Sequence, residues 1–252
     1  ENSTLTADSM NYDPKSRSVT ASGNVRFVSP EGELFSDEGT GFTDGRTFEM
    51  RGNVRGNFRS RSLDITCDSL EMESQGASPV VRRITGSGAV KLVRGGDSLT
   101  ADRVTWETGR ENYRASGSVK LRFGDYFLDS DEAARNEGQF WARNVRRYED
   151  RARELYITAS KASGLVRNGS VVELIADGNL VIDMRDSRGD NTRITGERGV
   201  FSQDRGTLVI SGGARAIQPG RDISAANIVY HLGSGRVEAL GERPTITFEM
   251  RD

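Results

Sequence analysis

The chain has 252 residues and a formal net charge of −2; 35% of its residues are apolar, 29% are charged and 29 are glycine. The low apolar fraction excludes a large globular core, whereas aromatic residues spread with Val, Ile and Leu along the chain exclude a disordered protein. The longest stretch without a charge, Ile223–Gly235, is shorter than the roughly 20 apolar residues that a membrane-spanning helix needs. We therefore expect a folded protein with a thin core and no membrane span.

Few residues here carry catalytic or metal chemistry. Cys67 is the single cysteine and His231 the single histidine, so an internal disulfide, a thiolate zinc site and most general acid–base mechanisms lack the groups they need. We predict that the protein is not an enzyme and uses no metal or cofactor, and we place His231 at the end of a strand. The sequence begins at Glu1, and we expect that any export signal has been removed.

Arginine outnumbers lysine by 31 to 4, but 37 acidic residues balance these cations, which disfavours a nucleic-acid partner. One arginine cluster is interleaved with acidic residues. We interpret it as a solvated face, with an anion-binding patch as the alternative; its residues are Arg143, Arg146, Arg147, Arg151 and Arg153, and the acids are Glu149, Asp150 and Glu154.

In chain order, a segment that starts with Leu or Ile recurs eight times, and the second residue after each lead is always Ala, Ser, Cys or Gly. Such a repeat is typical of stacked supersecondary units. An acidic residue follows in most copies, at Asp8, Asp37, Asp68, Asp102, Asp131 and Glu197; we interpret these as bulge or turn carboxylates rather than calcium ligands. We predict a single domain over residues 1–252, with repeats that start near residues 5, 34, 65, 99, 128, 157, 194 and 223.

The second half of each repeat alternates apolar and polar residues with a period of two, as in Val19–Phe27 and Tyr113–Leu121. This period predicts a β-strand with one face buried. The apolar positions change parity at the acidic residue of the first half, which predicts a bulge or kink there. Polar turns such as residues 13–16, 107–110 and 203–206 separate the halves, so eight repeats give about 16 strands, with longer loops at 74–79 and 185–191.

The fifth repeat departs from this pattern. Its second half, Trp141–Val145, lacks the glycine, and the run up to Leu155 is rich in charge. We predict a strand followed by a surface excursion or a short helix, and the role of residues 132–154 stays open.

These motifs resemble the OstA-like repeat of the lipopolysaccharide-transport proteins, the family of LptA, LptC and the periplasmic domain of LptD. The best copies are Leu5–Tyr12 with Val19–Phe27, and Leu99–Trp106 with Ala115–Leu121. The resemblance implies an all-β fold, an open, twisted antiparallel β-jellyroll. It also implies a periplasmic location, an apolar inside that holds lipid A acyl chains, and open edges that join neighbours of the same fold.

From the alternation and this resemblance together we predict an apolar trough for acyl chains. Its inward residues each follow the repeat glycine or alternate with it: Val25, Phe27, Met50, Val54, Leu92, Val119, Leu121, Leu180 and Ile182. Partners would be lipopolysaccharide and related jellyroll proteins, joined by strand addition at the exposed edges Thr4–Tyr12 and Thr245–Met250, with head-to-tail self-association as a further consequence.

The alternative is a β-solenoid scaffold or a carbohydrate-binding surface module that uses exposed strands and binds no lipid. A solenoid would stack parallel strands along one axis, whereas a jellyroll folds an antiparallel sheet over.

Overall fold

The computed structural model describes residues 3–43, 47–59, 62–74, 81–107, 112–185, 189–241 and 243–248. The chain divides into two compact units: unit 1 is Glu1–Phe123 with Ala134–Glu137, and unit 2 is Gly124–Ala133 with Gly138–Asp252. The single-domain interpretation stays a prediction, and each unit is described by itself. Parts of the predicted turns and loops at 75–80, 108–111 and 186–188, and the predicted strand end at 249–250, lie outside the described residues.

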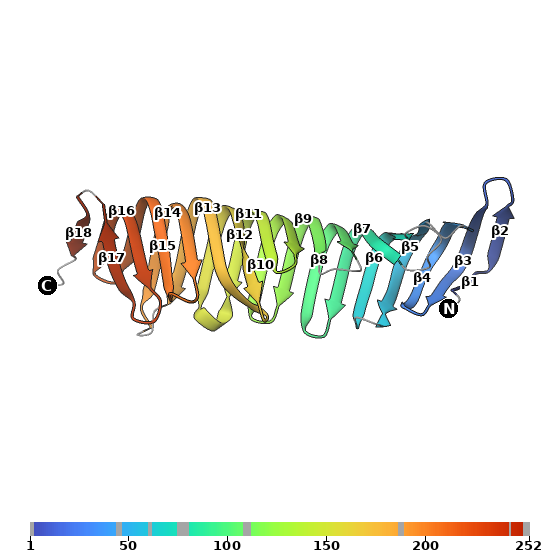
Figure 1. Cartoon of the computed structure of the whole chain (residues 1–252), viewed down its shortest axis with the longest axis horizontal. Helices are drawn as coiled ribbons and strands as arrows, with labels where there is room; N and C mark the ends of the chain where they lie inside the picture. Colours follow the sequence, from blue (N-terminus) through green and yellow to red (C-terminus); the bar gives the residue numbers. More distant parts are fainter. Residues whose placement is uncertain are drawn as a thin grey trace. The chain divides into compact units, whose positions relative to one another are not determined.

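Strands make up nearly all of both units, and Figure 1 labels them in chain order. Those of unit 1 are β1 (Thr4–Thr6), β2 (Ser9–Asp13), β3 (Ser18–Ser29), β4 (Gly32–Phe42), β5 (Thr47–Phe58), β6 (Leu63–Ser74), β7 (Val81–Arg94), β8 (Asp97–Glu107) and β9 (Asn112–Phe123).

Unit 2 contains most of β10 (Tyr126–Asn136), whose last residues belong to unit 1. Its other elements are β11 (Gln139–Asp150), the 3-10 turn η2 (Arg151–Arg153), β12 (Leu155–Arg167), β13 (Ser170–Arg185), β14 (Asn191–Ser202), β15 (Thr207–Gln218), β16 (Arg221–His231), β17 (Arg236–Leu240) and β18 (Thr245–Phe248). Among the described residues, no helix has the length and apolar character needed to cross a membrane.

Successive strands within each unit pair in antiparallel register, as in β5 with β6 and β13 with β14. This confirms the predicted all-β, open antiparallel fold of about 16 strands. It also contradicts one alternative, the parallel β-solenoid. The count of 18 arises because the first and last strands are each divided in two: β1 and β2 pair with different halves of β3, and β17 and β18 with different halves of β16.

The register of most strand pairs breaks near the middle, as predicted at the acidic residues. The partner strand bends at its glycine, at the same place: Gly52 and Asn53 have φ angles of +75° and +49°. Consecutive residues in the left-handed region turn the chain sharply, and glycine and asparagine are the residues that tolerate it. We call this break the corner.

Carboxylates of the preceding strand complete the corner. Asp37 Oδ2 accepts a hydrogen bond of 2.8 Å from Asn53 Nδ2, and Asp8 accepts one of the same length from Asn24. At the corner of the fifth repeat, which lacks the glycine, Asn144 has a positive φ of +50° and donates to Asp131 at 2.8 Å. The predicted bulge carboxylates therefore hold the bend.

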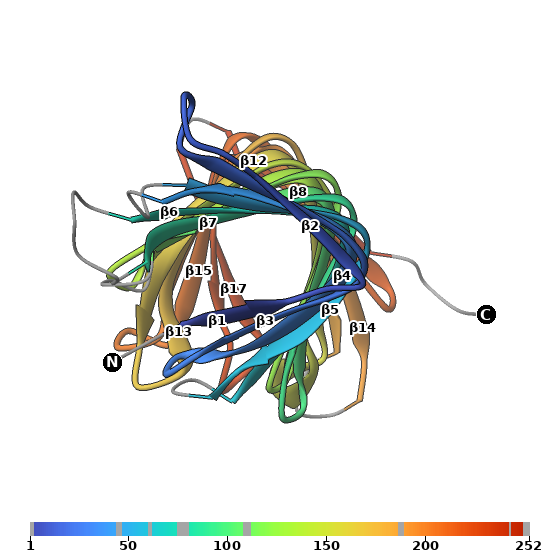
Figure 2. The ribbon, with the colours of Figure 1, turned by 90° about the vertical axis from the view of Figure 1, so that its right-hand side faces the viewer.

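The corner folds the sheet of each unit into two layers. In unit 1, layer A contains β2 and layer B contains β1, and Figure 2 shows these two strands on either side of the bend in β3. In unit 2, layer A contains β17 and layer B contains β18. We call the space enclosed between the layers the interior, and the side opposite the corner, where the hairpin turns lie, the mouth.

The small residue of each repeat lies at the inside of the corner. Cys67 is opposite Val54, and Ala101 is opposite Val90; all four are buried. Each of these small residues thus faces a buried valine of the preceding strand. In later repeats the facing residue is another apolar one, as Leu180 is for Gly196 and Ala214 for Ala225.

Candidate functional site

The predicted trough residues all lie on the inner face of the sheet, because each pairs with an inward neighbour, as Met50 does with Leu70 and Leu180 with Gly196. Six are fully buried: Val25, Met50, Val54, Val119, Leu180 and Ile182. Three are half-buried: Phe27, Leu92 and Leu121. The first seven in chain order belong to unit 1 and the last two to unit 2. Their contact with lipid stays a prediction.

The other strand of each pair contributes as much to the interior. Among its buried side chains are Leu34, Ile65, Leu70, Leu99, Ile157, Ile194, Ile223 and Ile228. Most of these are lead residues of the repeats, so the repeat alignment already carried the signal that could have placed them inside.

Aromatic pairs join the two layers of unit 1. The rings of Phe27 in layer B and Phe48 in layer A stack with centroids 4.9 Å apart. Phe58 and Trp106 meet edge to face at 6.0 Å, again from opposite layers. Such pairs contribute about 1 kcal/mol beyond the area that they bury. An apolar ligand entering the interior at these pairs would replace contacts between the layers with contacts to itself.

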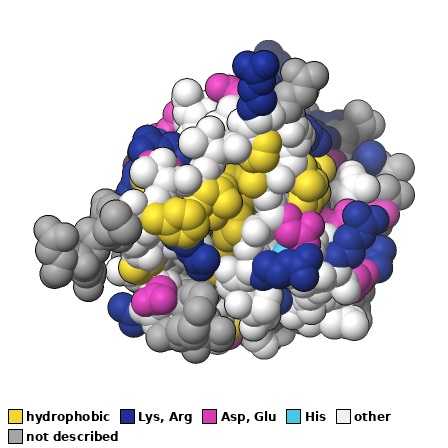
Figure 3. Space-filling model, turned by 90° about the vertical axis from the view of Figure 1, so that its left-hand side faces the viewer, with side chains coloured by type: hydrophobic (Ala, Val, Ile, Leu, Met, Phe, Trp, Pro, Cys, Tyr) yellow, Lys and Arg dark blue, Asp and Glu magenta, His cyan; other side chains and the backbone are white. Residues whose placement is uncertain are grey.

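Apolar inward side chains are left uncovered at the first strands of unit 1 and the last strands of unit 2. Met10 and Tyr12 in β2 pair with Ala21 and Val19, yet are 55% and 52% exposed. Ile246 in β18 pairs with buried Ile223 and is 50% exposed, and Phe248 is 68% exposed. Figure 3 shows apolar side chains gathered on the face of the molecule at the β18 end, with charged side chains around them.

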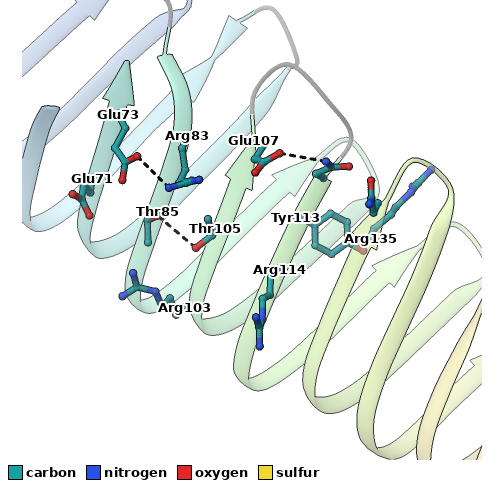
Figure 4. Close-up of a pocket in the computed structure, with 12 residues that line it drawn as sticks. Glu71, Glu73, Arg83, Thr85, Arg103, Thr105, Glu107, Tyr113, Arg114 and Arg135 are labelled. Carbon is teal, nitrogen blue, oxygen red and sulfur yellow. Dashed lines mark hydrogen bonds and ion pairs between the residues drawn. The ribbon is translucent and has the colours of Figure 1, made fainter. Parts of the chain in front are cut away.

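A polar hollow of about 450 Å³ lies on unit 1, mostly on the outer face of layer A (Figure 4). Within it, Arg83 Nη1 is 3.2 Å from Glu73 Oε2, and Asn112 Nδ2 donates to Glu107 at 3.3 Å. Thr85 and Thr105 lie side by side between them, with their hydroxyls 3.5 Å apart.

The arginine cluster of the fifth repeat is ion-paired throughout. Arg146 lies 2.6 Å from Asp129 and also contacts Asp131. Asn144 and then Arg146 hold the pKa of Asp131 below its usual value by hydrogen bonds to its carboxylate. The outer arginines therefore form the solvated face that the interleaved acids predicted. The 3-10 turn η2 is the predicted short helix.

His231 ends β16, as predicted. Its Nε2 lies 2.9 Å from Glu238 Oε1 in the neighbouring β17. This hydrogen bond, and then the one from Arg236, lowers the pKa of Glu238. The contact joins two adjacent strands and is a structural pair.

Comparison with known proteins identifies a family and a similar solved structure. The family described as "LptA/(LptD N-terminal domain) LPS transport protein" matches residues 64–236. Among solved structures, the chain is similar to LptH of Pseudomonas aeruginosa, described as the LptA-homologous periplasmic component of its lipopolysaccharide transport device. That match has 14% identity, covers 77% of this chain and 98% of that one, and has a TM-score of 0.26. No curated protein matches the sequence.

Proposed function

We propose that this chain, which belongs to the LptA/LptD N-terminal domain family of lipopolysaccharide transport proteins, holds lipopolysaccharide acyl chains in its apolar interior. It would act in the periplasm, as part of a bridge between inner and outer membrane, and without catalysis. The observation that carries the proposal is the line of inward apolar residues, buried within the units and uncovered in β2 and β18.

The driving force is differential solvation. Each CH₂ group moved from water to an apolar site gains about 0.8 kcal/mol. The interior side chains in contact with the lipid would be aliphatic, as at Val119 and Leu121, and such side chains give no directional bonds. An acyl chain could therefore be held along the strands and still slide, which is what transport needs.

The uncovered strands support the partner proposal. β1 and β2 pair with β3 alone among the described strands, and β17 and β18 with β16 alone. Such edges offer unpaired N–H and C=O groups to a further strand. A related jellyroll, or a second copy, added there would continue both the sheet and the apolar inner face.

The test is native mass spectrometry of protein purified from a host with an outer membrane. We expect co-purified lipopolysaccharide on the wild type and its loss in Val119→Asp and Leu180→Asp, because an unpaired charge against acyl chains is costly. Lys120→Asp, which changes the exposed neighbour of Val119, is the matched control and should keep the lipid. Folded Val119→Asp and Leu180→Asp variants with wild-type lipid content would refute the trough, and a carbohydrate ligand would favour the surface-module alternative.

A further inference from the structure

The turn between β11 and β12 differs from the other described turns at the layer B side of the mouth. Two-residue turns join the strands at three of these places, at residues 30–31, 95–96 and 219–220. The turn after β11 instead contains η2 (Arg151–Arg153) and Glu154, which has a left-handed φ of +48°. The fifth repeat therefore has a longer turn, with a 3-10 helix, at the mouth of unit 2.

A β-bulge in β11 turns the two polar residues Tyr148 and Asp150 towards the interior. The register shifts between Val145 and Tyr148, so that Arg146 and Arg147 together face a single partner position. Tyr148 then pairs with buried Ile157, and Asp150 pairs with buried Leu155. Without the bulge, the alternation from Val145 would have placed Arg147 inside.

Asp150 organises the turn from this buried position. It is 2% exposed, and its carboxylate accepts the backbone N–H of Arg153 at 3.2 Å and a second hydrogen bond from the Arg153 guanidinium. Tyr148 is 6% exposed, and burial, then the charge of Asp150, raises the pKa of its phenol. The Asp150 carboxylate is thus removed from water, whereas the Arg153 side chain stays 29% exposed.

Two contacts then connect layer B to layer A. The hydroxyl of Tyr126, at the start of β10, accepts the backbone N–H of Val171 in β13 at 3.2 Å. The guanidinium of Arg153 lies 5.3 Å from the ring centroid of Phe201 in β14. Val171 and Phe201 belong to the layer A halves of their strands, since they pair with Val166 and Leu174. Tyr126 also stacks on Tyr148, with ring centroids 6.3 Å apart.

We propose that Tyr126, Asp150 and Arg153 form a clasp that closes the mouth of unit 2 and controls sideways entry of acyl chains into its interior. This inference rests on the proposed function. With the clasp closed, the layers are joined at the mouth by the Tyr126–Val171 hydrogen bond and by Arg153 on Phe201. An acyl chain entering from the side must break both contacts, whereas one that slides along the strands does not cross them.

Two substitutions open the clasp with little change in shape. Tyr126→Phe removes the hydroxyl and keeps the stacked ring, and Arg153→Met removes the guanidinium and keeps an apolar stem near Phe201. The matched control is Arg151→Met in the same turn, because Arg151 is exposed and its guanidinium pairs with Glu149 of β11 at 3.1 Å. Circular dichroism checks that all three variants fold.

Two measurements report whether the clasp is closed or open. Hydrogen exchange of the Val171 amide reports the contact itself and should become at least tenfold faster in Tyr126→Phe. A photo-crosslinking amino acid at Phe140, a half-buried inward position in β11, reports arrival of purified lipopolysaccharide. We expect severalfold faster crosslinking in Tyr126→Phe and Arg153→Met, and wild-type rates for both readouts in Arg151→Met.

The possible results separate the two proposals. Crosslinking in the wild type with unchanged rates in both clasp variants would overturn the clasp and leave the lipid-binding function standing. An unchanged Val171 exchange rate in Tyr126→Phe would also overturn the clasp. No crosslinking in any protein, with lipid absent from the native mass spectrum, would overturn the proposed function and the clasp's role with it.

Discussion

At the scale of single residues, the corner explains most of the repeat. The acidic residue bonds to asparagine in the next strand, the glycine supplies a positive φ, and the small residue leaves room for a valine. The sequence indicated a kink at the acidic residue. It could not indicate that the opposite glycine bends as well, because that depends on which strand lies beside which.

Gly52 tests the corner. An added Cβ would lie 2.5 Å from Asp37 Oδ2 and 2.9 Å from Asp37 Cβ, on a backbone with φ of +75°. The clash either remains or displaces Asp37 from Asn53, so we expect Gly52→Ala to lower the free energy of unfolding by about 2 kcal/mol or more. Gly95→Ala is the control: its φ is +59° but no atom lies within 4 Å, so only the backbone cost of about 1 kcal/mol applies. Equal losses in urea unfolding would contradict a packed corner.

The reactivity of Cys67 measures how well the inside of the corner is shielded from solvent. Burial, and then the charge of Asp68, raises the pKa of its thiol from 9.0 to about 11. Since the thiolate is the reactive form, we expect alkylation at pH 8 to be roughly a hundredfold slower in the folded protein than in urea. Mass spectrometry of iodoacetamide-treated protein measures both rates. Comparable rates would mean that the corner is open to solvent.

At the scale of elements, the period-two alternation predicted the strands well, because in a folded sheet the buried face is set by alternation alone. It made no prediction past Val145 in β11, where the bulge at Arg146 and Arg147 exchanges the faces of the residues that follow. It also gave no sign that the terminal strands divide at the corner. An edge strand has only one neighbour to hold it across the bend, so β1 separates from β2 and β17 from β18.

The same face assignment explains the candidate site. All nine predicted residues face inwards because each follows the repeat glycine or alternates with it, whereas the inward residues of the other strand were overlooked. The cross-layer pairs, such as Phe27 with Phe48, could not be foreseen, since alternation says nothing about which strands face each other across the interior.

Phe58 measures how strongly the layers of unit 1 hold together. It is 5% exposed and meets Trp106 edge to face. We expect Phe58→Ala to cost about 3 kcal/mol or more of unfolding free energy. Phe42, at the end of β4, is 47% exposed, so Phe42→Ala should cost less than about 0.5 kcal/mol. Similar midpoints in urea for the two variants would show that the layers are not packed on each other.

At the scale of the whole molecule, the uncovered strands predict self-association. Head-to-tail joining does not close into a ring of fixed size, so analytical ultracentrifugation should show a ladder of species that grows with concentration. Replacing both Ile246 and Phe248 by Lys should shift the profile to monomer, because charges on the inner face of an edge strand oppose continuation of the apolar interior. Thr247→Lys changes the opposite face of β18 and should keep the ladder.

A monomeric wild type at high concentration, with no binding to a related jellyroll protein, would count against the bridge. It would leave an isolated lipid-binding protein or a surface module as the remaining functions.

The central claim is that acyl chains lie between the layers, and site-specific photo-crosslinking in cells tests it most directly. The crosslinking amino acid is placed at three half-buried inward positions, Phe27, Leu92 and Leu121, and at their exposed outward neighbours Arg26, Lys91 and Lys120. We predict lipopolysaccharide adducts at the three inward positions and none at the three outward ones. Adducts at the outward positions alone, or equally on both faces, would contradict an acyl chain held in the interior.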